Sequence, residues 1–195
     1  MPPLCYFVRH GQTAWNAEFR LQGQADTDMT GLGREQAVRN GRRLAELVDR
    51  PQDFDFVASP LKRTRETMEM IRAEMGLPPQ AYRTEPRLME VHFGDWQGLT
   101  YSELEERQPG CTAARFADKW GFVAPGAGGE SYRMLLDRVK PWFAALERPT
   151  ICVTHGGVIR ILFRLVEGMP ADEAAAMEVV QDRVLRFENS RLEWL

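Results

Sequence analysis

Four side chains that suit phosphate chemistry stand at or just after the ends of short apolar runs. They are Arg9, His10, Arg63 and His155. An arginine is always cationic and offers a planar fork to two phosphate oxygens, so Arg9 and Arg63 are candidates to grip an anion. A histidine is largely neutral near pH 7. The lone pair of one ring can therefore attack phosphorus while a second histidine stabilises the developing charge, so these residue types predict phosphoryl transfer.

Three apolar runs would have to position these side chains, and each has the pattern of a buried strand. LCYFV (4–8), DFVAS (55–59) and TICVT (150–154) are short, rich in Val, Ile, Phe or Tyr, and bounded by turn residues. In open parallel sheets, ligands bind beyond the carboxyl ends of the strands. The residues that follow the three runs are therefore expected to converge on one crevice, although His10 and His155 lie far apart in the sequence.

Helical patterns fall between the strands. Helices are expected from Thr30 to about Val48, from Pro60 to about Met75, from Glu130 or Ser131 to before Pro149, and after Gly157 along VIRILFRLV. The chain should end in two strands, VLRFEN and RLEWL, joined by a turn at Asn189 and Ser190. This alternation predicts an α/β fold, a three-layer α/β/α sandwich with a mainly parallel central sheet.

The length of the chain is typical of one domain, which we expect to span residues 1–195. Residues from about 99 to 129 do not fit the alternation of strands and helices, and we expect them to form a helical and loop lid insertion over one edge of the sheet. Three tryptophans are expected to pack the core or the lid: Trp96, Trp120 and Trp142.

The formal charge of −3 provides no overall cationic field that would attract nucleic acid or an anionic membrane. No apolar run approaches the roughly 18 residues of a membrane span. Arg9 and His10 also interrupt the apolar start before a secretory signal could form. The sequence therefore predicts a cytoplasmic protein with a small-molecule partner, and it leaves the oligomeric state open, a homodimer included.

The sequence indicates neither a cofactor nor a metal site. Its three cysteines, Cys5, Cys111 and Cys152, are an odd number without C-x-x-C spacing, which favours neither a disulfide framework nor a zinc site. The H-E-x-x-H pattern is absent, and two histidines beside arginines would repel a dication. We therefore expect activity to survive EDTA.

Five motifs occur in order along the chain: VRHGQTAWN (8–16) with LQG (21–23), SPLKRTRET (59–67), LMEVHFGDWQG (88–98), GGES (128–131) and VTHGG (153–157). Together they resemble the signature of the histidine phosphatase superfamily, which includes cofactor-dependent phosphoglycerate mutases. A bare R-H-G tripeptide would be weak support, but five ordered motifs that cover most of the chain are specific. One departure is Thr64, which stands where the family often has alanine.

The resemblance implies catalytic roles for five residues. His10 would be the nucleophile that becomes phosphohistidine, and three side chains would grip the phosphoryl group: Arg9, Arg63 and His155. Glu90 would be the general acid, which the chemistry requires because an alkoxide is a poor leaving group. We expect Glu90 to serve as an acid chiefly when the phosphate dianion of a substrate lies beside its carboxylate. The plainer alternative is that Glu90 only pairs with an arginine.

The remaining matches imply contacts with the substrate. Asn16 would hydrogen-bond a phosphate oxygen, and Gln22 and Gly23 would line the substrate entrance. Gly11 is expected to be small because the chain must turn sharply there and let the phosphate approach. Gly156 would open a helix whose N-terminal amides add positive potential near the anion.

The predicted function is hydrolysis of a small phosphorylated metabolite through a phosphohistidine on His10. Two alternatives stay open: a cofactor-dependent phosphoglycerate mutase and a non-catalytic phosphate-binding scaffold. The mutases that resemble this chain are longer between the acidic motif and the second histidine, which favours the phosphatase. His92 either contacts substrate or is a partly exposed loop histidine, and Arg72 is expected on the solvated surface.

Overall fold

The computed structural model describes residues 2–195, and its centre is a six-stranded sheet. The strands are β1 (Cys5–Arg9), β2 (Asp55–Ala58), β3 (Arg83–Thr84), β4 (Thr150–Thr154), β5 (Val184–Glu188) and β6 (Arg191–Trp194). They lie in the order β3-β2-β4-β1-β5-β6. The first four of these are mutually parallel, whereas β5 runs antiparallel to both β1 and β6. The prediction of a mainly parallel sheet with a closing hairpin is confirmed.

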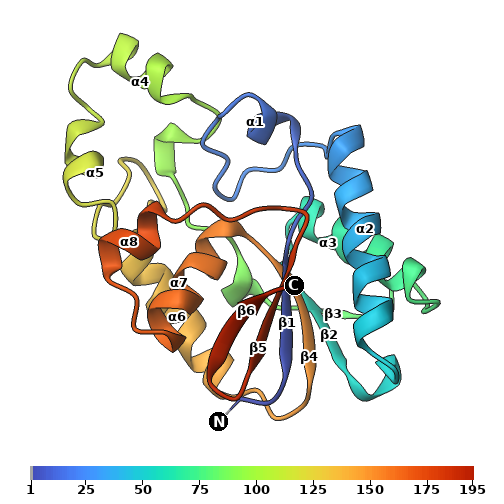
Figure 1. Ribbon diagram of the computed structural model, residues 1–195. Coiled ribbons are helices and arrows are strands. Elements are labelled where there is room, and N and C mark those ends of the chain that lie inside the picture. Colours follow the sequence, from blue (N-terminus) through green and yellow to red (C-terminus); the bar gives the residue numbers. More distant parts are fainter. Residues whose placement is uncertain (1) are drawn as a thin grey trace.

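Helices cover both faces of the sheet, which gives the predicted three layers (Figure 1). One face carries α2 (Gly31–Leu47) and α3 (Lys62–Glu74), and the other carries α6 (Tyr132–Ala144), α7 (Gly156–Val166) and α8 (Ala171–Ala176). The alternation of side chains along a strand assigns each residue to one layer. In β1, Tyr6 and Val8 pack in the cluster of α2 and α3, whereas Cys5 and Phe7 pack in the cluster of α6 and α7.

Local signals explain where the long helices begin. Thr30 caps α2 by accepting a hydrogen bond from the Gly33 amide, and Ser131 caps α6 in the same way through the Met134 amide. Helix α3 begins at Lys62, two residues later than the sequence predicted. The reason is that the Ser59 amide still donates to the Val153 carbonyl at 3.0 Å, so the chain stays extended after β2.

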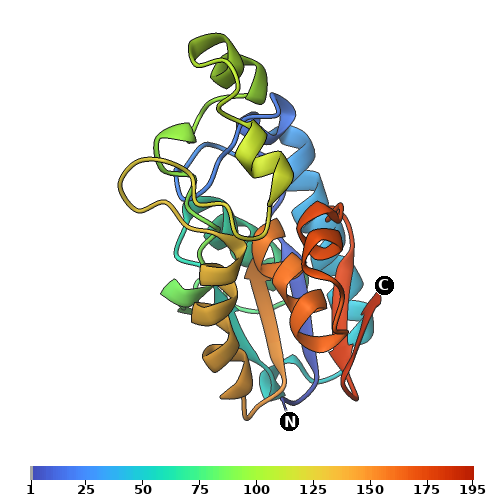
Figure 2. The same ribbon diagram turned by 90° about the vertical axis from the view of Figure 1, so that its left-hand side faces the viewer.

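The segment that interrupts the alternation stands above the carboxyl ends of the parallel strands (Figure 2). It holds α4 (Tyr101–Arg107) and α5 (Ala113–Ala117), joined by loops. The Trp96 and Phe122 rings stack with centroids 5.0 Å apart, and the Trp120 and Tyr132 rings stack at 6.0 Å. The first contact holds the segment against the 3-10 turn at Gly94–Trp96, and the second holds it against Tyr132, the first residue of α6 (Tyr132–Ala144). All three tryptophans named above are buried, so they pack the core as expected.

The remaining short helices are α1 (Ala14–Ala17) and the 3-10 turns at Pro51–Asp53, Pro86–Leu88 and Gly94–Trp96. One surface prediction is wrong: Arg72 is 4% exposed, because its guanidinium lies 4.3 Å from the centre of the Phe56 ring and its Nε donates to the Pro78 carbonyl. Among residues 2–195, no helix combines the length and the apolar character needed to cross a membrane.

Candidate active site

The two histidines converge at the carboxyl edge of the sheet, as their positions after β1 and β4 predicted. The His10 amide donates to the Thr154 carbonyl at 3.0 Å, which continues the pairing of β1 with β4. His155 follows β4 directly and is the N-cap residue of α7. The two rings are buried, with centroids 5.2 Å apart in an edge-on arrangement.

A backbone contact fixes the tautomer of His10. Its Nδ1 lies 2.8 Å from the Gly11 carbonyl oxygen, which can only accept, so Nδ1 carries the hydrogen and Nε2 keeps a lone pair. Arg63 Nε lies 3.3 Å from that Nε2. Burial, followed by the charges of Arg63 and Arg9, lowers the pKa of His10 well below its usual value of 6.5. His10 is therefore a neutral ring with one nucleophilic nitrogen.

Ser59 orients the second histidine, and sequence reasoning missed it. His155 Nε2 lies 2.8 Å from Ser59 Oγ, while His155 Nδ1 is buried without a hydrogen-bond partner. Burial, and then the nearby charges of Arg63 and Arg9, lower the pKa of His155 well below 6.5. The sequence could have identified Ser59 by its position, because Ser59 directly follows β2 and so lies at the same edge of the sheet as the histidines.

Arg63 lies in the first turn of α3 and is only 1% exposed. Its Nη2 donates to the Gly23 carbonyl at 2.6 Å and its Nη1 to the Ala25 carbonyl at 2.8 Å, and Nη1 also lies 3.2 Å from Asp26 Oδ1. These bonds aim the guanidinium at His10. Burial lowers the pKa of Arg63 to about 10, which still leaves it cationic at neutral pH.

Arg9 reaches the site from the last position of β1. Its Nη1 donates to the Val179 carbonyl at 2.5 Å, and its Nε is buried without a partner. Burial, and then the nearby charge of Arg160, lower the pKa of Arg9 to about 10. Arg9 and Arg63 therefore present two cationic groups beside the same neutral histidine.

Glu90 reaches the site from the loop that follows β3. Its Oε2 accepts from the Gly157 amide at 3.0 Å, and its Oε1 accepts from the Val91 amide at 2.9 Å. A Cβ on Gly157 would lie 2.0 Å from Oε1, so this approach requires a glycine. Glu90 forms no ion pair in the described part of the chain, so it does not simply pair with an arginine.

The reason for Gly11 differs from the one expected. A Cβ there would lie 2.1 Å from the Gly33 carbonyl oxygen, so α2 rather than the phosphate requires the small residue. The Gly11 amide donates to Thr67 Oγ1 at 3.1 Å, and its carbonyl orients His10. Gly11 therefore orients the His10 ring, and its amide is not free to bind a ligand because it already donates to Thr67.

Gln22 and Gly23 are buried rather than placed at the rim of the entrance. The Gly23 carbonyl holds Arg63, as described above. Gln22 Oε1 accepts from Thr13 Oγ1 at 3.0 Å, while Gln22 Nε2 is buried without a partner. A Cβ on Gly23 would lie 2.3 Å from Gln97 Oε1, so Gln97 packs against this segment, and the role of Gln22 and Gly23 at the substrate entrance stays a prediction.

Asn16 lies in the capping box of α1, which holds its carbonyl oxygen. Asn16 Oδ1 accepts from the Thr13 amide and from Gln181 Nε2, each at 3.1 Å, so the amide nitrogen is the group left for a ligand. Gln181 Nε2 also donates to the His10 carbonyl at 3.1 Å. Gln181, in the irregular segment before β5, carries no motif that would have identified it from the sequence.

His92 is the third histidine, and it is half-buried in the loop after Glu90. Its Nδ1 accepts from the Gly94 amide at 2.9 Å. That bond fits the interpretation of His92 as a partly exposed loop residue. Within residues 2–195, no three His, Cys, Asp or Glu side chains are grouped in a way that could hold a metal ion.

Unpartnered buried nitrogens concentrate around the two histidines. Five buried side-chain N or O atoms of the described residues make no hydrogen bond, and three of them belong to this site: Arg9 Nε, Gln22 Nε2 and His155 Nδ1. Burying a polar group without a partner is costly, so such a concentration indicates a ligand that supplies acceptors. All three can donate, and two arginines lie beside them. The site is therefore suited to a small oxyanion.

Comparison with known proteins agrees with this geometry. The family described as "Histidine phosphatase superfamily (branch 1)" matches residues 5–194. The chain is 39% identical over 178 residues to a glucosyl-3-phosphoglycerate phosphatase of Mycolicibacterium vanbaalenii, covering 85% of this chain and 74% of that one. It is 31% identical over 195 residues to the probable phosphoglycerate mutase GpmB of Salmonella paratyphi C, covering 97% and 86%.

Comparison with solved structures indicates the same family. The mycobacterial glucosyl-3-phosphoglycerate phosphatase Rv2419c, solved as a complex with VO3, superposes with a TM-score of 0.78. The sequence identity is 31%, and the match covers 98% of this chain and 96% of that one. The chain therefore belongs to branch 1 of the histidine phosphatase superfamily and is a phosphoric monoester hydrolase.

Proposed function

We propose that this phosphomonoesterase works in two steps through a phosphohistidine on His10. The proposal is supported by the bond between His10 Nδ1 and the Gly11 carbonyl, which leaves Nε2 as the nucleophilic nitrogen. The lowered pKa of His10 keeps that lone pair free of a proton. In the first step Nε2 forms a bond to phosphorus, and the ester oxygen leaves with the electron pair of the phosphorus–oxygen bond.

The observation that carries the proposal is the set of buried nitrogens without partners around the nucleophile. Arg9 Nε, Gln22 Nε2 and His155 Nδ1 would each donate to an oxygen of the phosphoryl group. Arg63 Nε, now 3.3 Å from His10 Nε2, would donate to an oxygen that arrives between them. Because these donors are held in place before the substrate binds, they stabilise the charge of the transition state without reorganisation.

Glu90 is proposed to supply the proton for the leaving group. Glu90 Oε2 accepts from the Gly157 amide at 3.0 Å, and a Cβ on the neighbouring Gly156 would lie 3.5 Å from Arg9 Nε; this closeness to the proposed phosphate site supports the role. A protonated Glu90 would give its proton to the ester oxygen as the bond to phosphorus breaks. In the second step the ionised Glu90 would take a proton from water, the water oxygen would bond to phosphorus, and Nε2 would be released with the lone pair it began with.

The proposed substrate is a small phosphorylated metabolite. The names of the two relatives described above refer to phosphoglycerate compounds, which makes phosphoglycerate esters the first substrates to test. A mutase must protect its phosphohistidine from water and return the phosphoryl group to an organic acceptor. We propose that residues 99–129 act as a lid above the site, and that this short lid admits water.

The test is to incubate the protein with a 32P-labelled phosphate ester and to measure label on the protein. We expect label that is labile in acid, stable in alkali and absent from His10→Ala, with inorganic phosphate released. Label that persists in His10→Ala would overturn the nucleophile assignment. Transfer of label to an added phosphoglycerate in preference to water would favour the mutase, and activity lost to EDTA and restored by magnesium would contradict the whole scheme.

A further inference from the structure

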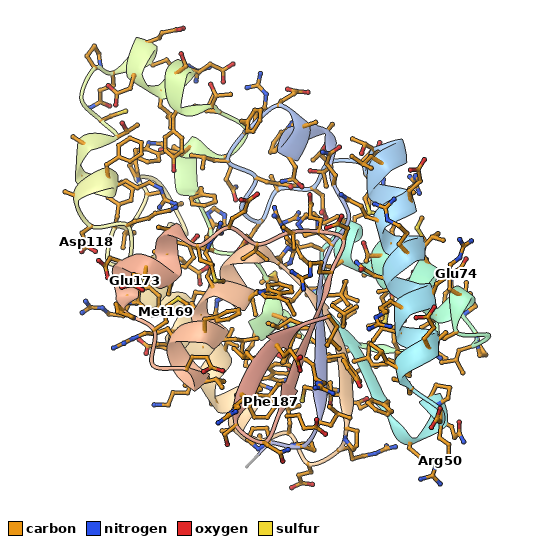
Figure 3. The ribbon with its side chains drawn as sticks, viewed as in Figure 1. Arg50, Glu74, Asp118, Met169, Glu173 and Phe187 are labelled. Atoms are coloured by element: carbon orange, nitrogen blue, oxygen red, sulfur yellow. The ribbon has the colours of Figure 1, made fainter. Side chains whose placement is uncertain are left out.

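The irregular segment 177–181 joins α8 to β5 and passes beside the nucleophile. It runs from the helix that carries Glu173 to the strand that carries Phe187, both of which are labelled in Figure 3. In Figure 1 this part of the chain crosses the upper end of the sheet, where the parallel strands end. Its last residue, Gln181, is half-buried, and its side chain reaches into the site.

The amide nitrogen of Gln181 donates two hydrogen bonds in the site. One goes to the His10 carbonyl and the other to Asn16 Oδ1, each at 3.1 Å. These two bonds use both hydrogens of the nitrogen. Because the His10 amide already donates to the Thr154 carbonyl, both backbone polar groups of His10 have a partner.

Backbone groups fix the direction of both carboxamides. A carbonyl can only accept, so the Gln181 atom beside the His10 carbonyl is the nitrogen. A backbone N–H can only donate, so the Asn16 atom 3.1 Å from the Thr13 amide is the oxygen. Asn16 Oδ1 therefore has two donors, whereas Asn16 Nδ2 has no partner among residues 2–195 and is left for a ligand.

Contacts with both layers of helices hold the backbone that carries Gln181. Asn40, buried on α2, donates from Nδ2 to the Gln181 carbonyl at 3.0 Å. On the other side of the sheet, the Val179 side chain is buried in the core cluster of α6 and α7. The Val179 carbonyl also accepts from Arg9 Nη1 at 2.5 Å. The segment is therefore fixed before a substrate arrives.

The direction of the Asn16 carboxamide matters because its two ends have opposite character. The nitrogen donates and the oxygen accepts, and the two are nearly the same size. A half-turn would present Oδ1 to the negatively charged oxygens of a phosphoryl group and would replace attraction by repulsion. Without Gln181, only the Thr13 amide would hold Oδ1, and one bond constrains the carboxamide less than two.

We propose that Gln181 is a positioning residue for phosphoryl transfer, which holds Asn16 so that Nδ2 donates to the phosphoryl group. A donor that is held in place before the reaction stabilises the transition state without reorganisation. This inference rests on the proposed function of His10, because it assigns a role within the same site. Gln181 contacts neither the phosphoryl group nor the leaving group in this scheme, and it acts through Asn16.

A double-mutant cycle tests whether Gln181 acts through Asn16, with kcat for p-nitrophenyl phosphate as the measurement. Gln181→Leu is similar in size but has no donor, and it should lower kcat by about 10- to 100-fold, the usual effect of one hydrogen bond to a charged group. Asn16→Ala should lower kcat at least as much. The double variant should be no slower than Asn16→Ala, because Gln181 then has no side chain to position. Losses that multiply in the double variant would overturn the proposal.

Gln181→Glu adds a pH profile, which a purely structural role would not change. The ionised side chain of this variant would direct only acceptors at the His10 carbonyl and Asn16 Oδ1, whereas its protonated form can donate to one of them. The ratio of its kcat to that of the wild type should therefore rise as the pH falls from about 8 to about 5.5, toward the pKa of a carboxyl group that faces two acceptors. The corresponding ratio for Gln181→Leu should stay constant. A Gln181→Glu ratio that does not change with pH would contradict the role.

Gln80→Leu is the matched control, because Gln80 is an exposed glutamine between α3 and β3. It should keep the wild-type kcat and pH profile. Thermal unfolding shows which variants are folded, and the pH profile of Gln181→Glu decides if Gln181→Leu does not fold. A folded Gln181→Leu with the wild-type kcat would overturn the positioning role alone. A wild type that neither hydrolyses p-nitrophenyl phosphate nor becomes labelled on His10 would instead overturn the proposed function.

Discussion

Hydrogen bonds give two buried histidines different tasks at this site. His10 donates through Nδ1 to a carbonyl and offers Nε2, whereas His155 contacts Ser59 through Nε2 and leaves Nδ1 unpartnered. Both rings have lowered pKa values, for the same reasons of burial and nearby arginines. Their surroundings therefore make both rings neutral, and the direction of the hydrogen bonds distinguishes the proposed nucleophile, His10, from His155, which is proposed to contact the phosphoryl group.

The first prediction concerns Glu90 and the leaving group. Glu90→Gln keeps the size of the side chain but cannot donate a carboxylic acid proton, so hydrolysis of alkyl phosphates should fall by about 100- to 10,000-fold. The phosphorylation of His10 by p-nitrophenyl phosphate should change far less, because p-nitrophenolate leaves without a proton. Rapid-quench measurement of the burst of p-nitrophenolate and of glycerol release from glycerol phosphate separates these cases.

Glu106→Gln is the control for this prediction, because Glu106 is exposed on α4 and lies outside the site. It should behave like the wild type with both substrates. An equal loss for both substrates in Glu90→Gln would mean that Glu90 only supports the shape of the site.

Helix α6 positions Glu90 without contacting the proposed phosphate site. Arg138 of α6 donates to the Arg87 carbonyl at 2.5 Å, the Met89 carbonyl at 2.7 Å and the Glu90 carbonyl at 2.9 Å. Its Nε also binds Glu130 Oε1 at 2.9 Å. One side chain therefore joins a helix to the whole loop that carries the proposed general acid.

The second prediction follows from this contact. Arg138→Met removes the donor to the Arg87 and Met89 carbonyls and leaves the largely buried Glu130 carboxylate without its cation, so the free energy of unfolding should fall by about 3–5 kcal/mol. If Arg138 positions Glu90, the surviving folded enzyme should lose more activity with glycerol phosphate than with p-nitrophenyl phosphate. Urea unfolding and kcat for the two substrates measure the two effects. Lys140→Met on the same helix should show neither, and equal losses with both substrates would mean that Arg138 only stabilises the fold.

The sequence predicted the elements that carry a strong local pattern. β1, β2 and β4 are apolar runs, and α2 and α6 begin at capping residues, so both kinds of element were found. β3 was missed because it is two exposed residues, too few to show the alternation of a strand. Short α8 was missed because six residues are too few to show a period.

Site residues were predictable where a motif or a strand end marks them. His10, His155 and Arg63 meet because parallel strands end at one edge of the sheet. Ser59 and Gln181 were missed because an isolated polar residue has no periodic signal, and its partner lies more than 90 residues away in the sequence. Arg72 was predicted to be exposed but is buried, because its guanidinium packs on the Phe56 ring of β2. A contact between two elements of this kind leaves no pattern in the local sequence.

At the scale of the whole molecule, a buried cluster of cations and neutral histidines costs stability, and a bound anion should offset that cost. The third prediction is that inorganic phosphate at about 100 times its Kd raises the free energy of unfolding by about 2.7 kcal/mol. For a chain of this size the rise in Tm should be about 5–10 °C. Arg9→Met should reduce this shift by more than half, because Arg9 Nε is one of the unpartnered donors.

Arg39→Met is the control for phosphate stabilisation, since Arg39 is exposed on α2. It should keep the wild-type shift in Tm. A shift of equal size in Arg9→Met and the wild type, measured by differential scanning calorimetry, would place the phosphate elsewhere on the protein.

The fourth prediction is that the folded protein loses stability as the pH falls below about 6.5. In the unfolded chain His10 and His155 bind protons near their usual pKa, whereas in the folded protein their pKa values are lowered and they stay neutral. The unfolded state therefore binds more protons, so the stabilisation is present above about pH 6.5 and is lost toward acid until the folded-state pKa is reached. Each histidine adds a slope of up to about 1.4 kcal/mol per pH unit.

Urea unfolding between pH 8 and pH 5 measures this slope. His155→Asn should reduce it by about half, because one of the two protons is then no longer taken up on unfolding. His92→Asn, which changes a histidine outside the buried pair, is the control and should keep the wild-type slope. A slope in His155→Asn as steep as in the wild type would show that groups other than the buried histidines govern the acid sensitivity of the fold.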